Sequence, residues 1–141
     1  MTHYKEIICA AIGMIGSAVS TILGGWTTAM TTLIIFMAID YISGLIVAGV
    51  FKKSLKTESG ALESRIGWKG LCRKGMTLLI VLVAYRLDIM VGGSYIKDAV
   101  CIAFVVNEAI SIIENAGLMG IKIPEPINAA IDMLTKKREG E

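Results

Sequence analysis

Residues 29–51 have the sequence AMTTLIIFMAIDYISGLIVAGVF, in which Asp40 is the single charged side chain. A helix that crosses a bilayer needs about 20 mainly apolar residues, so this run is long enough to span a membrane. Its eleven Leu, Ile, Val and Phe residues each favour insertion by about 0.3–0.6 kcal/mol, which offsets the roughly 2.5–3.5 kcal/mol cost of a central Asp. The run predicts a membrane-spanning helix with one acid near its middle.

The rest of the chain has the same character. Of 141 residues, 55% are hydrophobic and 18% are charged, and the mean hydropathy is +0.69. So few charges on so small a chain argue against a water-soluble monomer. Three further apolar runs cover residues 7–23, 75–91 and 99–119, with tight glycine turns at residues 24–26 and 92–94. These features predict one all-α membrane domain, residues 1–141, with four transmembrane helices.

The fourth run is the least secure of the four predicted spans. Its nine Leu, Ile, Val and Phe residues must compensate for four polar residues, Asn107, Glu108, Glu114 and Asn115. On the same scale the polar cost roughly exceeds the apolar gain, so this helix needs protein partners, water or protonation. A three-span topology avoids the cost but leaves the basic tail on the outer side, and we therefore favour four spans.

Basic residues are unevenly distributed along the chain. The segment 52–74 is the longest polar stretch, and we interpret it as a cytoplasmic loop and anchor whose basic residues are Lys52, Lys53, Lys56, Arg65, Lys69, Arg73 and Lys74. With four spans, twelve of the fourteen basic residues lie on one side. Because cytoplasmic segments retain Lys and Arg, both termini are predicted to be cytoplasmic. The tail, residues 120–141, is predicted to form a short amphipathic helix at the membrane surface.

One face of the fourth predicted span is polar. At about 100° per residue, its polar side chains fall within an arc of roughly 120°, and they are Asn107, Glu108, Ser111, Glu114 and Asn115. Lipid cannot satisfy such groups, so the face must turn toward other helices or toward water. Two interpretations stay open: hydrogen bonding inside a closed bundle, or the lining of a pore or assembly face.

Asp40 has a small-residue seam beside it, formed by Gly44 and Ala48 at four-residue steps. If the second and fourth spans are antiparallel neighbours, Asp40 and Glu108 lie at similar depth. A meeting of these two acids would require a proton or a cation between them. Arg86 is the expected cation, and Arg86 with Asp88 also fits a pair at the membrane interface that anchors a short helix.

The first predicted span carries a second small-residue seam, which consists of Gly13, Gly16, Ser17, Ser20 and Gly24. Small residues at three- and four-residue spacing let membrane helices approach closely. The seam predicts a packing face, either within one chain or between copies.

An enzyme is not expected from this sequence. The single histidine, His3, lies at the terminus, and no HExxH, GxSxG, Walker A or Rossmann glycine pattern is present. The three cysteines are isolated, so no metal site and no cofactor are predicted. The basic segment suits anionic lipid and not nucleic acid. A small proton-coupled transporter of the multidrug type remains an alternative, although such proteins use an acid in the first span and this first span has none.

Three stretches resemble the toxin-secretion/phage-lysis holin family. They are IIFMAIDYISGLIVAG (residues 34–49), SRIGWKGLCRKG (64–75) and NEAISIIENAGLMGIKIPEPI (107–127). The last is the most specific, because its spaced Asn-Glu, Ser, Glu-Asn, Gly and Pro positions are not generic membrane sequence.

This resemblance implies a non-enzymatic protein that forms homo-oligomers in the bacterial inner membrane and opens lesions there. By the same resemblance, the lesions release or activate an endolysin, which need not touch the holin directly, and the host cell lyses. Some relatives are linked to toxin export, which is a further alternative.

Overall fold

The computed structural model describes residues 2–140, which form helices joined by turns and loops with no strand among them. The elements are α1 (Thr2–Ile22), α2 (Thr28–Ile46), a short π-helical continuation η1 (Val47–Phe51), α3 (Ser64–Val91), α4 (Ile96–Leu118) and α5 (Glu125–Glu139). The all-α prediction is confirmed. Two helices, Thr2–Ile22 and Thr28–Phe51, are long and apolar enough to cross a membrane.

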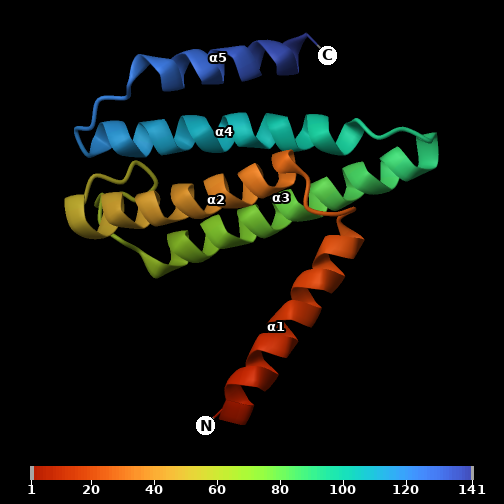
Figure 1. The fold of residues 1–141 in the computed structure, drawn as a ribbon. Helices are drawn as coiled ribbons and strands as arrows, with labels where there is room; N and C mark the ends of the chain where they lie inside the picture. Colours follow the sequence, from red (N-terminus) through yellow and green to blue (C-terminus); the bar gives the residue numbers. More distant parts are fainter. Residues whose placement is uncertain (1, 141) are drawn as a thin grey trace.

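The bundle is built around α4. In Figure 1, α2 and α3 lie side by side below α4, and α5 lies along the opposite side of α4. One end of the bundle carries the turns before α2 and before α4, and we call it the turn end. The other carries the segment between η1 and α3, and we call it the loop end.

Helices α2 and α4 run parallel, both from the turn end to the loop end (Figure 1). The expected antiparallel packing of these two segments is therefore wrong. The reason is topological, because α3 returns the chain to the turn end before α4 begins. The expectation of similar depth survives, since Asp40 and Glu108 each lie twelve residues beyond the first residue of their own helix.

The apolar core lies between α2, α3 and α4. Met30, Leu33 and Val81 are fully buried, as is Cys101 of α4. Helix α2 begins at Thr28 because the hydroxyl oxygen of Thr27 accepts a hydrogen bond from the Met30 backbone N–H at 3.2 Å, which caps the helix.

Helix α3 corrects the predicted boundary of the basic loop. We expected a loop over residues 52–74, but α3 already begins at Ser64, so the loop covers only 52–63. Four of the predicted anchor residues, Arg65, Lys69, Arg73 and Lys74, are helical. The 28 residues of α3 give a length of about 42 Å, which exceeds the roughly 30 Å hydrocarbon layer. The polar first turns were mistaken for loop because apolar periodicity is weak there.

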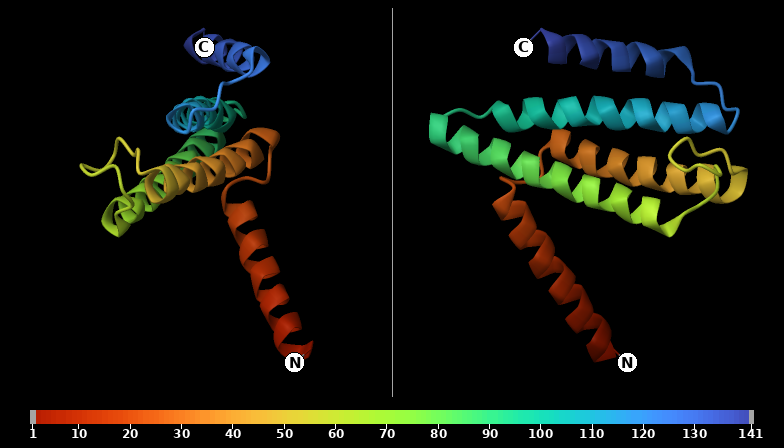
Figure 2. Two further views of the ribbon diagram at one scale, coloured as in Figure 1. Left: turned by 90° about the vertical axis from the view of Figure 1, so that its left-hand side faces the viewer. Right: turned by 180° about the vertical axis from the view of Figure 1, so that it is seen from behind.

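Helix α5 confirms the predicted C-terminal helix, but its position differs from expectation. It runs antiparallel along α4 in both orientations (Figures 1 and 2), and it does not extend away from the end of the bundle. The chain reverses at Gly120, whose φ of +82° favours glycine. Near the far end of α5, the guanidinium Nη1 of Arg138 donates to Asn107 Oδ1 at 3.3 Å.

Helix α1 stands apart from the rest. It projects from the turn end and diverges from the bundle (Figure 2), and none of its residues is buried. It begins at Thr2, five residues before the predicted start at residue 7.

Candidate functional site

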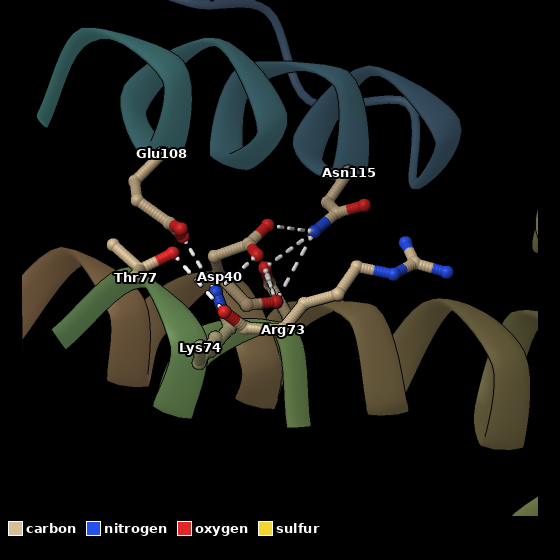
Figure 3. Close-up of polar contacts among 7 residues, drawn as sticks. Asp40, Arg73, Lys74, Thr77, Glu108 and Asn115 are labelled. Carbon is tan, nitrogen blue, oxygen red and sulfur yellow. Dashed lines mark hydrogen bonds and ion pairs between the residues drawn. The ribbon is translucent and has the colours of Figure 1, made fainter. Parts of the chain in front are cut away.

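A lysine from α3 joins two acids from α2 and α4. The Lys74 Nζ lies 2.8 Å from Asp40 Oδ2 and 2.6 Å from Glu108 Oε2. Figure 3 shows Glu108 and Asp40 directed toward this ammonium group from different helices. All three side chains are at most 15% exposed. Because water screens these charges only weakly, the two ion pairs tie the three helices together.

Asn115 adds an amide to the same cluster. Its Nδ2 donates to Ser43 Oγ at 2.8 Å and to Asp40 Oδ1 at 3.2 Å. The Ser43 hydroxyl in turn donates to the Asp40 backbone carbonyl at 3.1 Å. We call these five residues the Lys74 network: Asp40, Ser43, Lys74, Glu108 and Asn115. Every buried side-chain nitrogen and oxygen among residues 2–140 has a hydrogen-bond partner, so the network is satisfied.

A cavity of about 270 Å³ adjoins the network at the loop end. It lies between α2, α3 and α4, and its lining includes all five residues of the predicted polar face together with Asp40 and Gly44. Gly44 faces Asn115 across this space, and a Cβ at this position would make ordinary van der Waals contact with Asn115 Nδ2, at 3.8 Å. The structure thus gathers the seven residues of the predicted face and seam around one space.

The polar face of α4 is divided between two environments. Glu108, Ser111 and Asn115 turn inward and are at least half-buried, whereas Asn107 and Glu114 are exposed at the cavity edge. The inward residues carry the ion pair and the amide contacts. The exposed pair leaves a polar edge on the outside of α4, part of which Arg138 contacts.

Arg86 and Asp88 do not belong to this site. Arg86 is exposed, while Asp88 is buried at the turn end, where its carboxylate accepts the backbone N–H groups of Ile96 and Lys97 at 2.8 Å each. Asp88 therefore caps the start of α4 from the neighbouring helix, because the first N–H groups of a helix lack intrahelical partners. No ion pair joins Asp88 to Arg86 within residues 2–140, so the expected pair is wrong, and the expected cation role of Arg86 falls to Lys74.

Within residues 2–140, the small-residue seam of α1 meets no other part of the protein along most of its length. A Cβ at Gly13 or Gly16 would meet nothing within 4 Å. Gly24 differs, because its φ is +79° and a Cβ there would collide with the ring of Tyr85. Gly24 thus belongs to the turn that joins α1 to the bundle, and the other seam residues face outward or lie half-buried.

Lys97 is a polar residue that the sequence did not single out. It is 4% exposed, its Nζ donates to the Gly25 carbonyl at 3.0 Å, and it lies 5.6 Å from the centre of the Tyr85 ring. The predicted basic anchor also divides, since Lys74 is internal while the other six residues are on the surface or at the cavity mouth. A usable signal for Lys74 was its place directly before an apolar run. If the helix of that run begins one turn earlier, Lys74 is part of it and lies inside the bundle.

The chain has recognisable relatives among known proteins. Residues 17–136 match the bacteriophage holin family. The chain is 33% identical to a probable holin of Bacillus phage phi105 over 103 residues, which is 72% of this chain and 70% of that protein. It is 33% identical to an uncharacterised protein of Clostridium perfringens strain 13, over 93% of this chain and 94% of that protein. A 14.9 kDa uncharacterised protein from the nagH 3′ region of C. perfringens is 32% identical, over 98% of this chain and 100% of that protein. No solved structure matches the chain.

The two apolar helices, each long enough to cross a membrane, and the family match together indicate a small helical membrane protein. Within that class, the chain belongs to the bacteriophage holin family, because the family match covers most of its length.

Proposed function

We propose that the protein is a lysis holin that oligomerises in the bacterial cytoplasmic membrane and opens lesions through which an endolysin is released or activated. The observation that carries this proposal is the cavity beside the Lys74 network, which gathers the whole polar face of α4. In one subunit two of these groups are paired inside the bundle, Glu108 with Lys74 and Asn115 with Asp40 and Ser43. In an assembly, the same groups can face water and line a lesion.

Two packings of comparable free energy are needed for such a change. Hydrocarbon cannot solvate the polar face, so a lone subunit keeps its inward residues, Glu108, Ser111 and Asn115, between its own helices. Subunit contacts in a crowded membrane favour a second packing in which water solvates the face, and the population shifts when enough copies have accumulated. The proposed pore-side residues are Asn107, Glu108, Ser111, Glu114 and Asn115, with Asp40 and Gly44 as their partner seam. No covalent chemistry is involved.

We further propose four spans, with both ends of the chain in the cytoplasm and residues 52–63 on the same side. This topology requires α5 to leave α4 in the membrane. If α5 stayed against α4, Arg138 would lie at the level of Asn107, which is the middle of α4. Each basic residue at that depth raises the free energy of membrane insertion by about 2.5–3.5 kcal/mol. A three-span arrangement, with α4 outside the hydrocarbon, would leave α5 in place.

The outward-facing part of the α1 seam supports self-association, since α1 packs against no other helix along most of its length. Small residues are the usual contact between helices in lipid. The surface lysines and arginines of the loop end, Lys52, Lys53, Lys56, Arg65, Lys69 and Arg73, are proposed to hold the chain to anionic headgroups of the inner leaflet.

The test is inducible expression in a bacterium with and without a co-expressed peptidoglycan hydrolase, while culture turbidity and membrane potential are followed. A holin stops growth and collapses the potential abruptly at a fixed time, and turbidity falls only when the hydrolase is present. A proton-coupled transporter would slow growth gradually and leave the hydrolase confined, which would reject the proposal.

A further inference from the structure

The segment 52–63 lines the loop end of the cavity beside the Lys74 network. Six residues of this segment line the cavity, and they are Ser54, Leu55, Lys56, Thr57, Leu62 and Glu63. Three of those in the early part of the loop, Ser54, Lys56 and Thr57, are polar or charged. In the left view of Figure 2 the segment projects from the side of the bundle at the loop end, beside the ends of α2 and α3, and its residues line the cavity from that side. It therefore lies where water from that side would enter.

The segment holds its own shape. The Ser54 N–H donates to the Gly60 carbonyl at 3.0 Å, and the Thr57 hydroxyl donates to the Ala61 carbonyl at 2.9 Å. Within residues 2–140, no hydrogen bond from residues 54–62 reaches α3 or α4. The segment is attached to the bundle by packing. For example, the Cδ2 atom of Leu62 would lie 3.8 Å from a Cβ placed on Gly49. A compact segment held by so few contacts can move at small free-energy cost.

Both ends of the segment have the features of hinges. At the first, Lys52 directly follows η1 and has a φ of +52°, a left-handed conformation that is uncommon for a residue other than glycine. Short π-helical turns recur at functional sites. At the second, Glu63 precedes α3 in an extended conformation, and its side chain makes no capping hydrogen bond. The segment is thus joined to α2 and α3 through two positions at which the backbone can change direction.

We propose that residues 52–63 form a gate over the cytoplasmic mouth of the polar cavity, and that its opening sets the time of lysis. This proposal rests on the proposed function, because it assumes that the cavity residues are the ones that later meet water. With the gate closed, Glu108, Ser111 and Asn115 stay shielded from the cytoplasm. With the gate open, water reaches the Lys74 network, competes for its ion pairs and favours the packing that lines a lesion.

Gly60 offers a way to hold the gate open. Its φ is +73°, and a Cβ there would collide with the Lys52 carbonyl oxygen, so Gly60→Ala cannot keep the present loop conformation. Gly92→Ala is the matched control, because its φ of +71° imposes the same kind of strain at the turn end and its Cβ would meet nothing within 4 Å.

The readout is the reaction of a cysteine at position 111 with a water-soluble maleimide applied to inside-out membrane vesicles before any lysis. The chain carries Ser111→Cys together with Cys9→Ser and Cys72→Ser, since those two cysteines are exposed, while Cys101 is buried and stays. Gly60→Ala should raise the labelling rate about tenfold and bring lysis forward, and Gly92→Ala should do neither. Equal rates in Gly60→Ala and the parent chain would overturn the gate.

A second pair of variants holds the gate closed. Gly49→Cys with Leu62→Cys, joined by a short bifunctional thiol reagent, should delay lysis, whereas each single cysteine treated in the same way should not. The regulatory role of the segment would be rejected by an unchanged lysis time in the joined chain, or by faster labelling of Gly60→Ala without earlier lysis. In both cases lysis itself would still occur. Absence of lysis in the parent chain would instead reject the proposed function, and the labelling rates would still decide whether the segment closes the cavity.

Discussion

Replacing Lys74 with methionine tests the network most severely. Methionine keeps the length and volume of the side chain but removes the charge that lies between Asp40 and Glu108. Two carboxylates that are each at most 15% exposed then face one another without a cation. Removing one partner of a buried ion pair typically costs about 3–5 kcal/mol, because the remaining charge is left uncompensated.

The assay is thermal unfolding of the purified protein in detergent, followed by circular dichroism. A loss of about 3–5 kcal/mol corresponds to a fall in Tm of about 10 °C or more for a chain of this size. The control is Lys69→Met on the exposed side of the same helix, which should change Tm by less than about 2 °C, since surface substitutions stay near 0.5 kcal/mol.

A compensated variant separates charge from packing. Asp40→Asn and Glu108→Gln, added to Lys74→Met, remove all three charges and should restore most of the lost Tm. The reasoning is refuted if Lys74→Met melts within 2 °C of the parent chain, or if the triple variant is no more stable than Lys74→Met alone.

Further substitutions probe other parts of the account. Glu108→Gln breaks one ion pair of Lys74 and should shift lysis time strongly without loss of membrane insertion. Glu114→Gln, at the exposed cavity edge, should shift lysis time less. Lysis at the wild-type time in both variants would remove the polar face from the mechanism. Asp88→Ala removes two hydrogen bonds at the start of α4 and should lower stability by about 1–2 kcal/mol, seen as a lower Tm with unchanged lysis time. A spin label at Met133 of α5 should report the membrane interface in lipid vesicles, and a position fixed beside α4 would contradict the four-span topology.

The helices of this protein could be predicted from the sequence to a large extent. The apolar runs place α2, α3 and α4, and the glycine turns at residues 24–26 and 92–94 separate α1 from α2 and α3 from α4, because lipid-length apolar runs and left-handed glycines are strong local signals. The start of α3 at Ser64 was missed, since its first turns carry basic residues that hide the helical period. Local composition could not distinguish a basic loop from a helix that extends beyond the membrane.

The candidate site could be predicted in part. The polar spacing in α4 and the isolated Asp40 identify residues that the structure gathers around one cavity. The position of Lys74 directly before an apolar run was a signal that it lies inside the bundle, but its pairing with Asp40 and Glu108 could not be predicted, because that depends on how α3 is placed beside α2. The same limit applies to Asp88, whose role as a cap for α4 comes from a contact between helices that no local pattern encodes.

The packing of α5 along α4 depends on solvent as well as sequence. In the structure the reversal at Gly120 brings Arg138 to Asn107. A bilayer would oppose this arrangement, because basic side chains at mid-depth are costly there. Both positions of α5 are compatible with its sequence, which has apolar residues on one face and basic residues in its last turn.

The central claim is that the inward residues of the polar face of α4, Glu108, Ser111 and Asn115, are shielded in the resting subunit and meet water when the membrane opens. Its most direct test follows maleimide labelling of Ser111→Cys in growing cells through the time of lysis, in the chain that lacks Cys9 and Cys72. The account predicts slow labelling before the membrane potential collapses and a rise of at least tenfold at the collapse. Leakage of a dye while position 111 stays unlabelled would contradict it.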